Sequence, residues 1–205
     1  MLHRREPSPP PMLTVIIPTH NSERALVTTL AMLVPGALAG TVRDVIVADA
    51  GSTDATARVV DVAGCEMMVS DAPLAARLRS AVTAARGNWL LFLHPGVVLD
   101  PSWVEEAARA IDHAVRRGTA GSHAAVFRRA ADADIGLARQ MIALLAAAWR
   151  GAHPEQGLMI SRTAYDRLGG HRDGVADPEA DLLRRIGRRR IVTLRSAATG
   201  WRAGD

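Results

Sequence analysis

The chain has 205 residues, and its composition, 48% hydrophobic and 22% charged, excludes a disordered protein and predicts one domain with a real core. All 25 basic side chains are arginine and the net charge is +4, which favours an anionic ligand, although a general preference for arginine codons accounts for it equally well. Aromatic residues make up only 3%, too few to stack the bases of a single-stranded nucleic acid, so no nucleic-acid partner is expected.

The cysteine content and the chain's first residues indicate where the protein resides. Cys65 is the single cysteine, which excludes an intramolecular disulfide and a multi-cysteine zinc site and fits a cytoplasmic protein. Residues 1–12 are rich in proline and carry no apolar run, so we expect a disordered tail rather than a signal peptide. No apolar stretch reaches the roughly 18–20 residues of a membrane-spanning helix. Residues 13–205 are expected to form a single domain.

The first predicted unit is a strand, a loop and a helix. Residues 13–17 are apolar and β-branched and stop at Pro18, as expected of a buried parallel strand. Asn21 or Ser22 is the predicted cap of a helix that begins near Glu23. This helix carries Leu26, Leu30 and Leu33 at helical spacing, and Pro35-Gly36 is predicted to end it.

A second strand, residues 45–48, follows and ends at Asp49, before the turn-forming residues 50–54. Because ligands bind at the carboxyl ends of strands in open α/β sheets, the loops after the two strands are expected to lie side by side at a binding edge. A carboxylate there can accept hydrogen bonds from a base N–H or a ribose hydroxyl. The alternative is that Asp49 and Asp54 only shape the turn or cap the next helix.

The two phrases VIIPTHN and VIVADAGSTD, at this separation, resemble the nucleotide-binding half of the inverting family 2 glycosyltransferases. The resemblance implies the GT-A fold, which is an α/β, Rossmann-like domain with a mostly parallel central sheet flanked by helices. It also implies that these loops bind a nucleotide-sugar donor. The residues that it assigns to the nucleotide are Pro18, Thr19, His20, Asn21, Asp49 and Ser52.

The next elements follow from apolar periodicity and from glycine and proline stops. Helices are predicted at residues 55–63, 74–86, 102–117 and 133–149, and strands at 66–69, 89–93, 124–129 and 191–194. The resemblance places Arg79 beside the nucleotide, although a solvated helix face explains that residue as well. The broad apolar face of residues 133–149 is expected to pack in the core, with peripheral membrane contact or a homodimer face as the second interpretation.

The segment ARGNWLLFLHPGVVLDPSW resembles the short bacterial members of the family, in which a His-Ala-Asp-Thr type motif holds a divalent Mg or Mn ion. Here His94 stands in the first position of that motif and Gly96 replaces its last carboxylate. Such cations prefer oxygen ligands, so the metal motif is degenerate. Asp100 is more naturally the cap of the next helix than a ligand.

The last third of the chain carries the rest of the resemblance. It places Glu155, Gln156 and Gly157 on the acceptor side of the site, and Glu179 at the position of the general base that deprotonates the acceptor hydroxyl. The alternative for Glu179 is structural, because Asp177-Pro178-Glu179 is a good helix start. The arginines at 184–190 offer charge for a diphosphate, with a solvated face as the alternative.

The sequence therefore predicts a glycosyltransferase that moves a sugar from a nucleotide-sugar to the hydroxyl of an unnamed acceptor with inversion. The alternative is a pseudoenzyme of the same fold that binds a nucleotide or a partner, to which Gly96 and Pro178 point. A nucleotidyltransferase ranks lowest, because the loop after the first strand lacks the glycines of a phosphate-binding loop.

Overall fold

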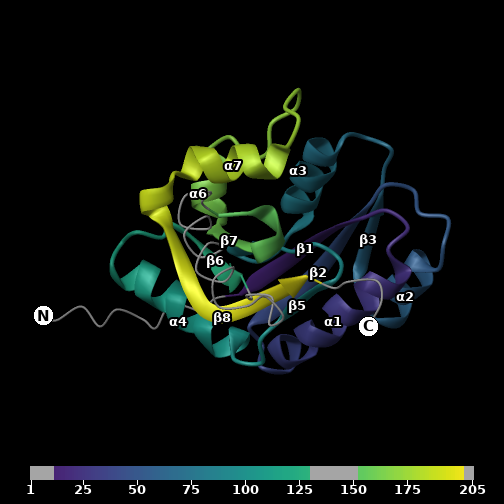
Figure 1. Ribbon diagram of the computed structural model, residues 1–205, viewed down its shortest axis with the longest axis horizontal. Helices are drawn as coiled ribbons and strands as arrows, with labels where there is room; N and C mark the ends of the chain where they lie inside the picture. Colours follow the sequence, from purple (N-terminus) through teal and green to yellow (C-terminus); the bar gives the residue numbers. More distant parts are fainter. Residues whose placement is uncertain (1–11, 130–151, 201–205) are drawn as a thin grey trace, which may run out of the picture.

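A computed structural model describes residues 12–129 and 152–200. The expected tail and the predicted helix at 133–149 lie outside these residues. Eight strands form one sheet in the order β3-β2-β1-β4-β7-β6-β8-β5 (Figure 1). The strands are β1 (Leu13–Thr19), β2 (Val42–Asp49), β3 (Glu66–Val69), β4 (Trp89–Phe92), β5 (Val97–Leu99), β6 (Ala124–Arg129), β7 (Leu158–Ser161) and β8 (Ile191–Gly200).

The sheet is mostly parallel, as predicted. Strands β3, β2, β1 and β4 pair in parallel, and β7 then runs antiparallel to both β4 and β6. Strand β8 runs parallel to β6 and antiparallel to the short β5. The carboxyl ends of β1, β2 and β4 consequently meet at one edge of the sheet, where the sequence placed the binding loops.

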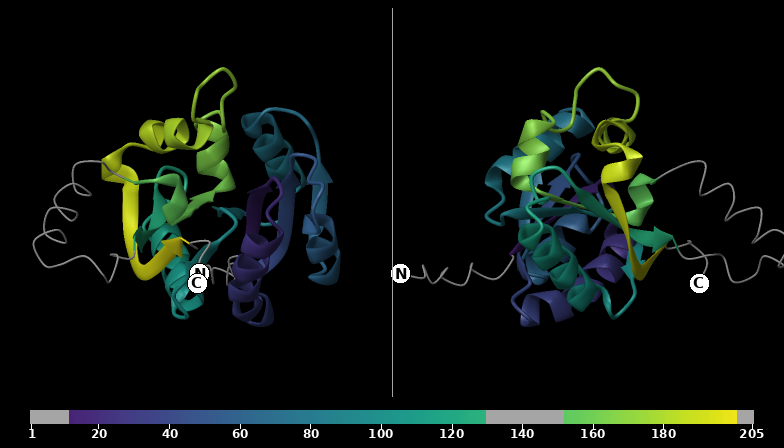
Figure 2. Two further views of the ribbon diagram at one scale, coloured as in Figure 1. Left: turned by 45° about the vertical axis from the view of Figure 1, so that its right-hand side comes forward. Right: turned by 90° about the vertical axis from the view of Figure 1, so that its left-hand side faces the viewer.

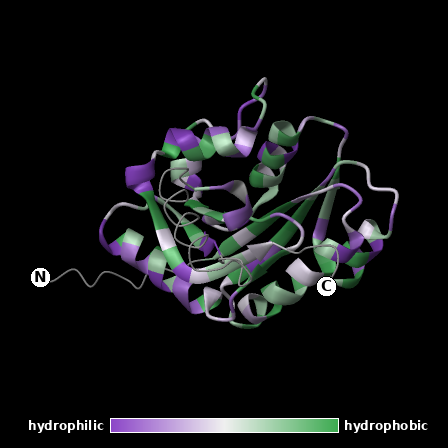
Figure 3. Ribbon diagram, in the orientation of Figure 1, coloured by the Kyte–Doolittle hydropathy of each residue, from purple (hydrophilic) through white to green (hydrophobic). Residues whose placement is uncertain are grey.

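Helices cover both faces of the sheet (Figure 2). One face packs against α1, α2 and α4, and the other packs against α3, α6 and α7. Successive residues of β1 point to opposite faces, so Val15 and Ile17 join the first core and Ile16 the second. This two-sided burial explains the continuous apolar run, which Figure 3 shows in green. The helices are α1 (Glu23–Leu38), α2 (Thr56–Val62), α3 (Leu74–Ala84), α4 (Trp103–Arg116), α6 (Arg162–Arg167) and α7 (Pro178–Ile186), with 3₁₀ turns η1 (Pro154–Gln156) and η2 (Arg188–Arg190).

The prediction that Pro35-Gly36 ends the first helix is wrong, because α1 continues to Leu38. The indole of Trp103 lies across this part of α1 and its Nε1 donates to the carbonyl of Met32 at 3.0 Å. A Cβ on Gly36 would lie 2.7 Å from the Trp103 ring, so glycine here permits the close contact between α1 and α4. Tertiary packing therefore carries the helix past two residues that locally favour its end.

Strand β8 is longer than the predicted residues 191–194 and extends to Gly200. Its second half is made of small and polar residues, which give no strand signal in the sequence. These residues are extended because they pair with β5 and β6. In addition, the carboxylate of Glu106 accepts from the backbone N–H groups of Arg195 and Ser196 and fixes the strand to α4.

Candidate functional site

The site lies where β1, β2 and β4 end. Thr19 and Asp49 are register partners at the ends of β1 and β2, and the N–H of Ala50 donates to the carbonyl of Thr19 at 2.9 Å. His94 follows the adjacent strand β4, and Glu179 reaches the same region from the first turn of α7. Most of the residues predicted to bind the nucleotide, together with the predicted general base Glu179, therefore lie at one edge of the sheet.

Asp49 is fully buried and joins the two loops. One carboxylate oxygen accepts from the hydroxyls of Thr19 at 2.7 Å and Ser52 at 2.5 Å, and the other accepts from the N–H groups of Gly51 and Ser52. Burial raises the pKa of Asp49, but these hydrogen bonds outweigh it and the net pKa is lowered. These are the contacts that the turn-shaping alternative predicted for Asp49.

The loop after β1 is held against the loop after β2 by side chain to backbone bonds. The N–H of Asn21 donates to the Ser52 hydroxyl at 2.8 Å, and the Asn21 side chain accepts from the N–H of Thr53 at 2.8 Å. Asn21 adopts a positive φ of 49°, which asparagine tolerates better than most residues. His20 beside it is exposed and accessible to a ligand.

Ser22 occupies the N-cap position of α1, as one of the two predicted candidates, but the capping bond comes from another residue. Ser22 makes no side-chain capping bond, and the carboxylate of Asp54 accepts instead from the N–H of Glu23 at 3.1 Å. Asp54 also accepts from the N–H of Thr56, so one exposed carboxylate serves the starts of both α1 and α2. The cap comes from a loop 31 residues away, which local spacing does not indicate.

Two arginines of α3 have different partners. Arg79, predicted to lie at the nucleotide, donates to the carbonyl of His171 at 2.8 Å and to Asp173 at 2.6 Å, and so ties α3 to the loop before α7. Arg77 instead reaches the strand ends, where it donates to the carbonyls of Ala48 and Thr19. Burial lowers the pKa of Arg77 while the charge of Asp49 raises it, and the net direction is down. Sequence reasoning missed Arg77 as the arginine beside Asp49.

His94 and Glu179 form the charged centre of the site. His94 Nε2 lies 2.9 Å from Glu179 Oε2, although the imidazole N–H does not align with that oxygen as a hydrogen bond requires. The Glu179 side chain is 10% exposed, whereas that of His94 is 32% exposed. Burial lowers the pKa of His94, but contact with Glu179 and the charges of Glu155 and Asp177 outweigh burial, and the net pKa is raised.

The structural alternative for the start of α7 is also present. Asp177 is the helix cap, accepting from the N–H groups of Glu179 at 3.1 Å and Ala180 at 2.9 Å, and Pro178 occupies the first turn. This arrangement fixes the backbone of Glu179 while its side chain turns to His94. The helix start and a functional carboxylate are therefore compatible at this position.

His171, which the sequence did not single out, lies buried near Glu179. The Tyr165 hydroxyl accepts the backbone N–H of His171 at 3.2 Å and shares a second hydrogen bond with Nδ1 at 2.8 Å. Nε2 has no hydrogen-bond partner within the described ranges, and the ring packs edge-on against Phe92. Burial, partly opposed by the charge of Glu179, lowers the pKa of His171 to about 4.

The buried imidazole predicts acid sensitivity. Because the pKa of His171 is lower in the folded protein than the usual 6.5, its contribution to stability is full above 6.5 and falls as pH drops toward about 4. We expect the free energy of unfolding to fall by up to about 1.4 kcal/mol per pH unit in this window from this residue. Denaturant melts of His171→Phe should show a flatter dependence, whereas Tyr165→Phe, which keeps the imidazole, should retain it. Equal slopes in wild type and His171→Phe would contradict the assignment.

The residues predicted for the acceptor side form a tight turn. Gln156 donates to the carbonyl of Phe127 and accepts from the N–H of His153, both at 2.8 Å. Gly157 has φ of 70°, and a Cβ there would lie 2.7 Å from Leu93. Glu155 is exposed and lies 3.8 Å from Arg129. Gln156 and Gly157 thus shape the turn, and Glu155 is the exposed member of the three.

The side chains after β4 do not fit a divalent metal. Gly96 provides no ligand, and Asp100 already accepts from the N–H and hydroxyl of Ser102 at the start of α4. Across residues 12–129 and 152–200 there is no group of three or more histidine, cysteine or acidic side chains that could hold a metal ion. His94 offers one nitrogen where Mg²⁺ or Mn²⁺ would want several oxygens.

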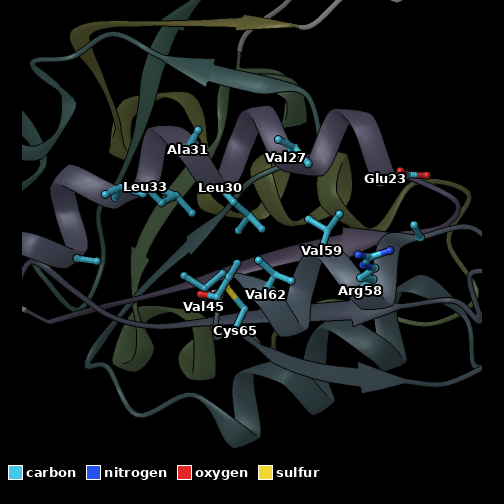
Figure 4. A pocket seen from close by; sticks show the side chains of 14 residues that line it. Glu23, Val27, Leu30, Ala31, Leu33, Val45, Arg58, Val59, Val62 and Cys65 are labelled. Atoms are coloured by element: carbon cyan, nitrogen blue, oxygen red, sulfur yellow. Dashed lines mark hydrogen bonds between the residues drawn. The ribbon is translucent and has the colours of Figure 1, made fainter.

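Two cavities lie away from this edge. One, of roughly 540 Å³, is an apolar groove between α1 and α2, with Leu30 and Val59 on its walls, Glu23 and Arg58 at one end, and Cys65 beneath (Figure 4). Burial raises the pKa of the Cys65 thiol. The other, of roughly 770 Å³, lies between α4 and β8. Neither is lined by the strand-end residues, so the candidate site rests on the side chains that converge there.

Comparison with known proteins gives the family. Residues 14–151 match the sequence pattern described as glycosyl transferase family 2. The chain belongs to this family. The match covers the loops after β1 and β2 and the segment after β4, and it ends before Glu155, Gln156, Gly157 and Glu179. No curated protein matches the sequence.

Solved structures of glycosyltransferases have the same fold as this family member. Glucosyl-3-phosphoglycerate synthase from Mycobacterium tuberculosis, with Mn²⁺, UDP and its product, matches with a TM-score of 0.63 and 20% identity over 94% of this chain and 72% of that one. PcManGT, a Pyrobaculum calidifontis mannosyltransferase in complex with GDP-Man and Mn²⁺, matches with a TM-score of 0.68 and 18% identity over 94% of this chain and 57% of that one. TarS from S. aureus matches with a TM-score of 0.67 and 16% identity over 93% of this chain and 37% of that one.

These likenesses confirm the predicted GT-A fold. Identities this low establish shared architecture and leave substrates open. The metal in two of these relatives contrasts with the side chains after β4 in this chain. No helix of the described ranges has the length and apolarity needed to cross a membrane.

Proposed function

We propose that this family 2 member transfers a sugar from a nucleotide-sugar to an acceptor hydroxyl with inversion, and that Glu179 is the general base. The observation that carries the proposal is the buried Glu179 carboxylate, which converges with His94 on the edge formed by the loops after β1 and β2. The relatives solved with UDP and GDP-Man support a nucleotide-sugar as the donor class.

In this proposal the nucleotide lies over the loops that Asp49 holds together. His20 and the backbone of the loop around Gly51 are exposed and can meet the base and ribose. Gly51 has φ of 82°, and a Cβ at this position would have nothing within 4 Å, so the backbone is open to close approach by a ligand. The sugar then extends from the diphosphate toward His94 and Glu179.

The chemistry is a direct displacement. Glu179 accepts the proton of the acceptor hydroxyl while that oxygen attacks the anomeric carbon from the side opposite the diphosphate. The bond from the anomeric carbon to the diphosphate oxygen breaks, and the nucleoside diphosphate leaves with the electron pair. Positive charge beside the leaving group stabilises the developing negative charge, and His94 lies where it can supply that charge.

Nucleotide release from a donor panel tests the proposal. UDP-glucose and GDP-mannose, among other nucleotide-sugars, are incubated with the full chain, and free nucleoside diphosphate is quantified with and without Mn²⁺. We expect slow hydrolysis of at least one donor, with water taking the acceptor's place. Donor binding without release would favour the pseudoenzyme alternative, which the missing carboxylate at Gly96 supports. Absence of both binding and release would reject the transferase.

A further inference from the structure

The position after β4 holds a side chain that can itself serve as a cation. His94 faces carboxylates from two elements, namely Glu179 and Asp177 at the start of α7 and Glu155 in η1. Glu179 is the contacting group at 2.9 Å, and the other two act through their charges. His171 adds no positive charge here, because its ring is neutral at ordinary pH. A positively charged imidazole among three carboxylates takes the electrostatic place that a bound metal would have.

The geometry leaves this imidazole able to bind an anion. Its Nε2 is directed at Glu179 without an aligned hydrogen bond, and no residue in the described ranges accepts a hydrogen bond from Nδ1. The ring is about one-third exposed, so its outer edge is accessible from the strand-end loops. A protonated imidazole has two N–H donors, and one can remain with Glu179 while the other binds a phosphate oxygen.

We propose that His94, held by Glu179, binds the diphosphate of the nucleotide in place of a metal ion, so that nucleotide binding does not require a divalent cation. This inference rests on the proposed function and deepens it. His94 then has two roles: its charge offsets part of the negative charge of the diphosphate, and its contact with Glu179 positions the general base. The raised pKa of His94 supports a charged ring at neutral pH.

Isothermal titration of UDP and GDP into the full chain, in EDTA and in Mn²⁺, tests the inference. Wild type should bind one of the nucleotides with the same affinity in both buffers. His94→Gln should weaken that nucleotide about ten- to hundredfold, as expected for a lost charge-assisted hydrogen bond. His94→Arg, which keeps the charge, should retain most of the affinity, and His113→Gln, at an exposed histidine of α4, should match wild type.

Two further measurements distinguish a lost phosphate contact in His94→Gln from a general loss of folding. Uridine or guanosine, which lack phosphate, should bind wild type and His94→Gln equally in NMR titrations. Mn²⁺ titrated alone into wild type, followed by electron paramagnetic resonance, should show no site filled at millimolar metal, and this needs no variant.

Each contrary result has a distinct meaning. Binding that needs Mn²⁺, or a filled Mn²⁺ site in the free protein, would overturn the inference and leave the proposed transferase intact. Equal weakening of nucleoside and nucleotide in His94→Gln would assign His94 a structural role only. Absence of any nucleotide binding by wild type, with or without metal, would reject the proposed function and the inference together.

Discussion

Glu179→Gln should lower the rate of nucleotide release from the active donor by about 10²- to 10⁴-fold, the usual contribution of a general base. The amide keeps the size of the side chain but cannot take the acceptor proton. The backbone position is held by Asp177, so the start of α7 should persist. The carboxylate also contacts His94, so its loss is expected to cost about 1–3 kcal/mol of stability.

The control for Glu179→Gln is a substitution of another glutamate that also lies near a helix start but is remote from the site. Glu105 lies in the first turn of α4 and its side chain is 80% exposed, so Glu105→Gln is the matched control and should keep wild-type turnover. Nucleotide affinity should fall in Glu179→Gln but less than in His94→Gln, because the raised pKa of His94 depends on its contact with Glu179. A variant that turns over within a few-fold of wild type would show that another group accepts the proton.

Asp49→Ala should produce the largest loss of stability among single changes in the loops, about 3–5 kcal/mol. Asp49 is fully buried and accepts four hydrogen bonds, so alanine leaves the hydroxyls of Thr19 and Ser52 and two backbone N–H groups without their acceptor. Because these bonds join the loops, nucleotide binding should be lost with them. Urea denaturation gives the free energy, and calorimetry gives the affinity.

The control for this prediction is Asp54→Ala, which removes an exposed carboxylate from the same loop and should cost much less stability, as a lost cap. The pH dependence adds a second test. Since the pKa of Asp49 is lowered on folding, its contribution is full above the usual value and is lost as pH falls through the folded value. Asp49→Ala should therefore be less acid-sensitive than wild type, and a loss no greater than that of Asp54→Ala would contradict the role assigned to Asp49.

The first half of the fold could be predicted because its signals are local. The apolar run of β1 ends at the edge of the sheet, and the glycine-containing turn after β2 adjoins it, so pattern alone located both loops. The course of α1 beyond Pro35 could not be predicted, since it depends on Trp103 packing on Gly36 from another helix. The contact with Trp103 therefore outweighs the local preference of Pro35 and Gly36 to end the helix.

The sequence named residues that the structure brings to one edge of the sheet, but not the contacts that these residues make. His94 and Glu179 were each named from a motif, but their pairing joins β4 to α7 across a long stretch of chain. Likewise, Arg77 and Arg79 are two residues apart on one helix, and only the packed structure shows which one faces Asp49. The role of His171 depends on Tyr165 and Phe92 closing around it, which no spacing reveals.

A crystal structure of the full chain with UDP or GDP, grown in EDTA, tests the central claim most directly. The account predicts the base and ribose over the loops after β1 and β2, with the diphosphate beside His94 and the acceptor side open to Glu179. A nucleotide bound elsewhere, for example in the apolar groove between α1 and α2, or a diphosphate remote from His94, would contradict the account.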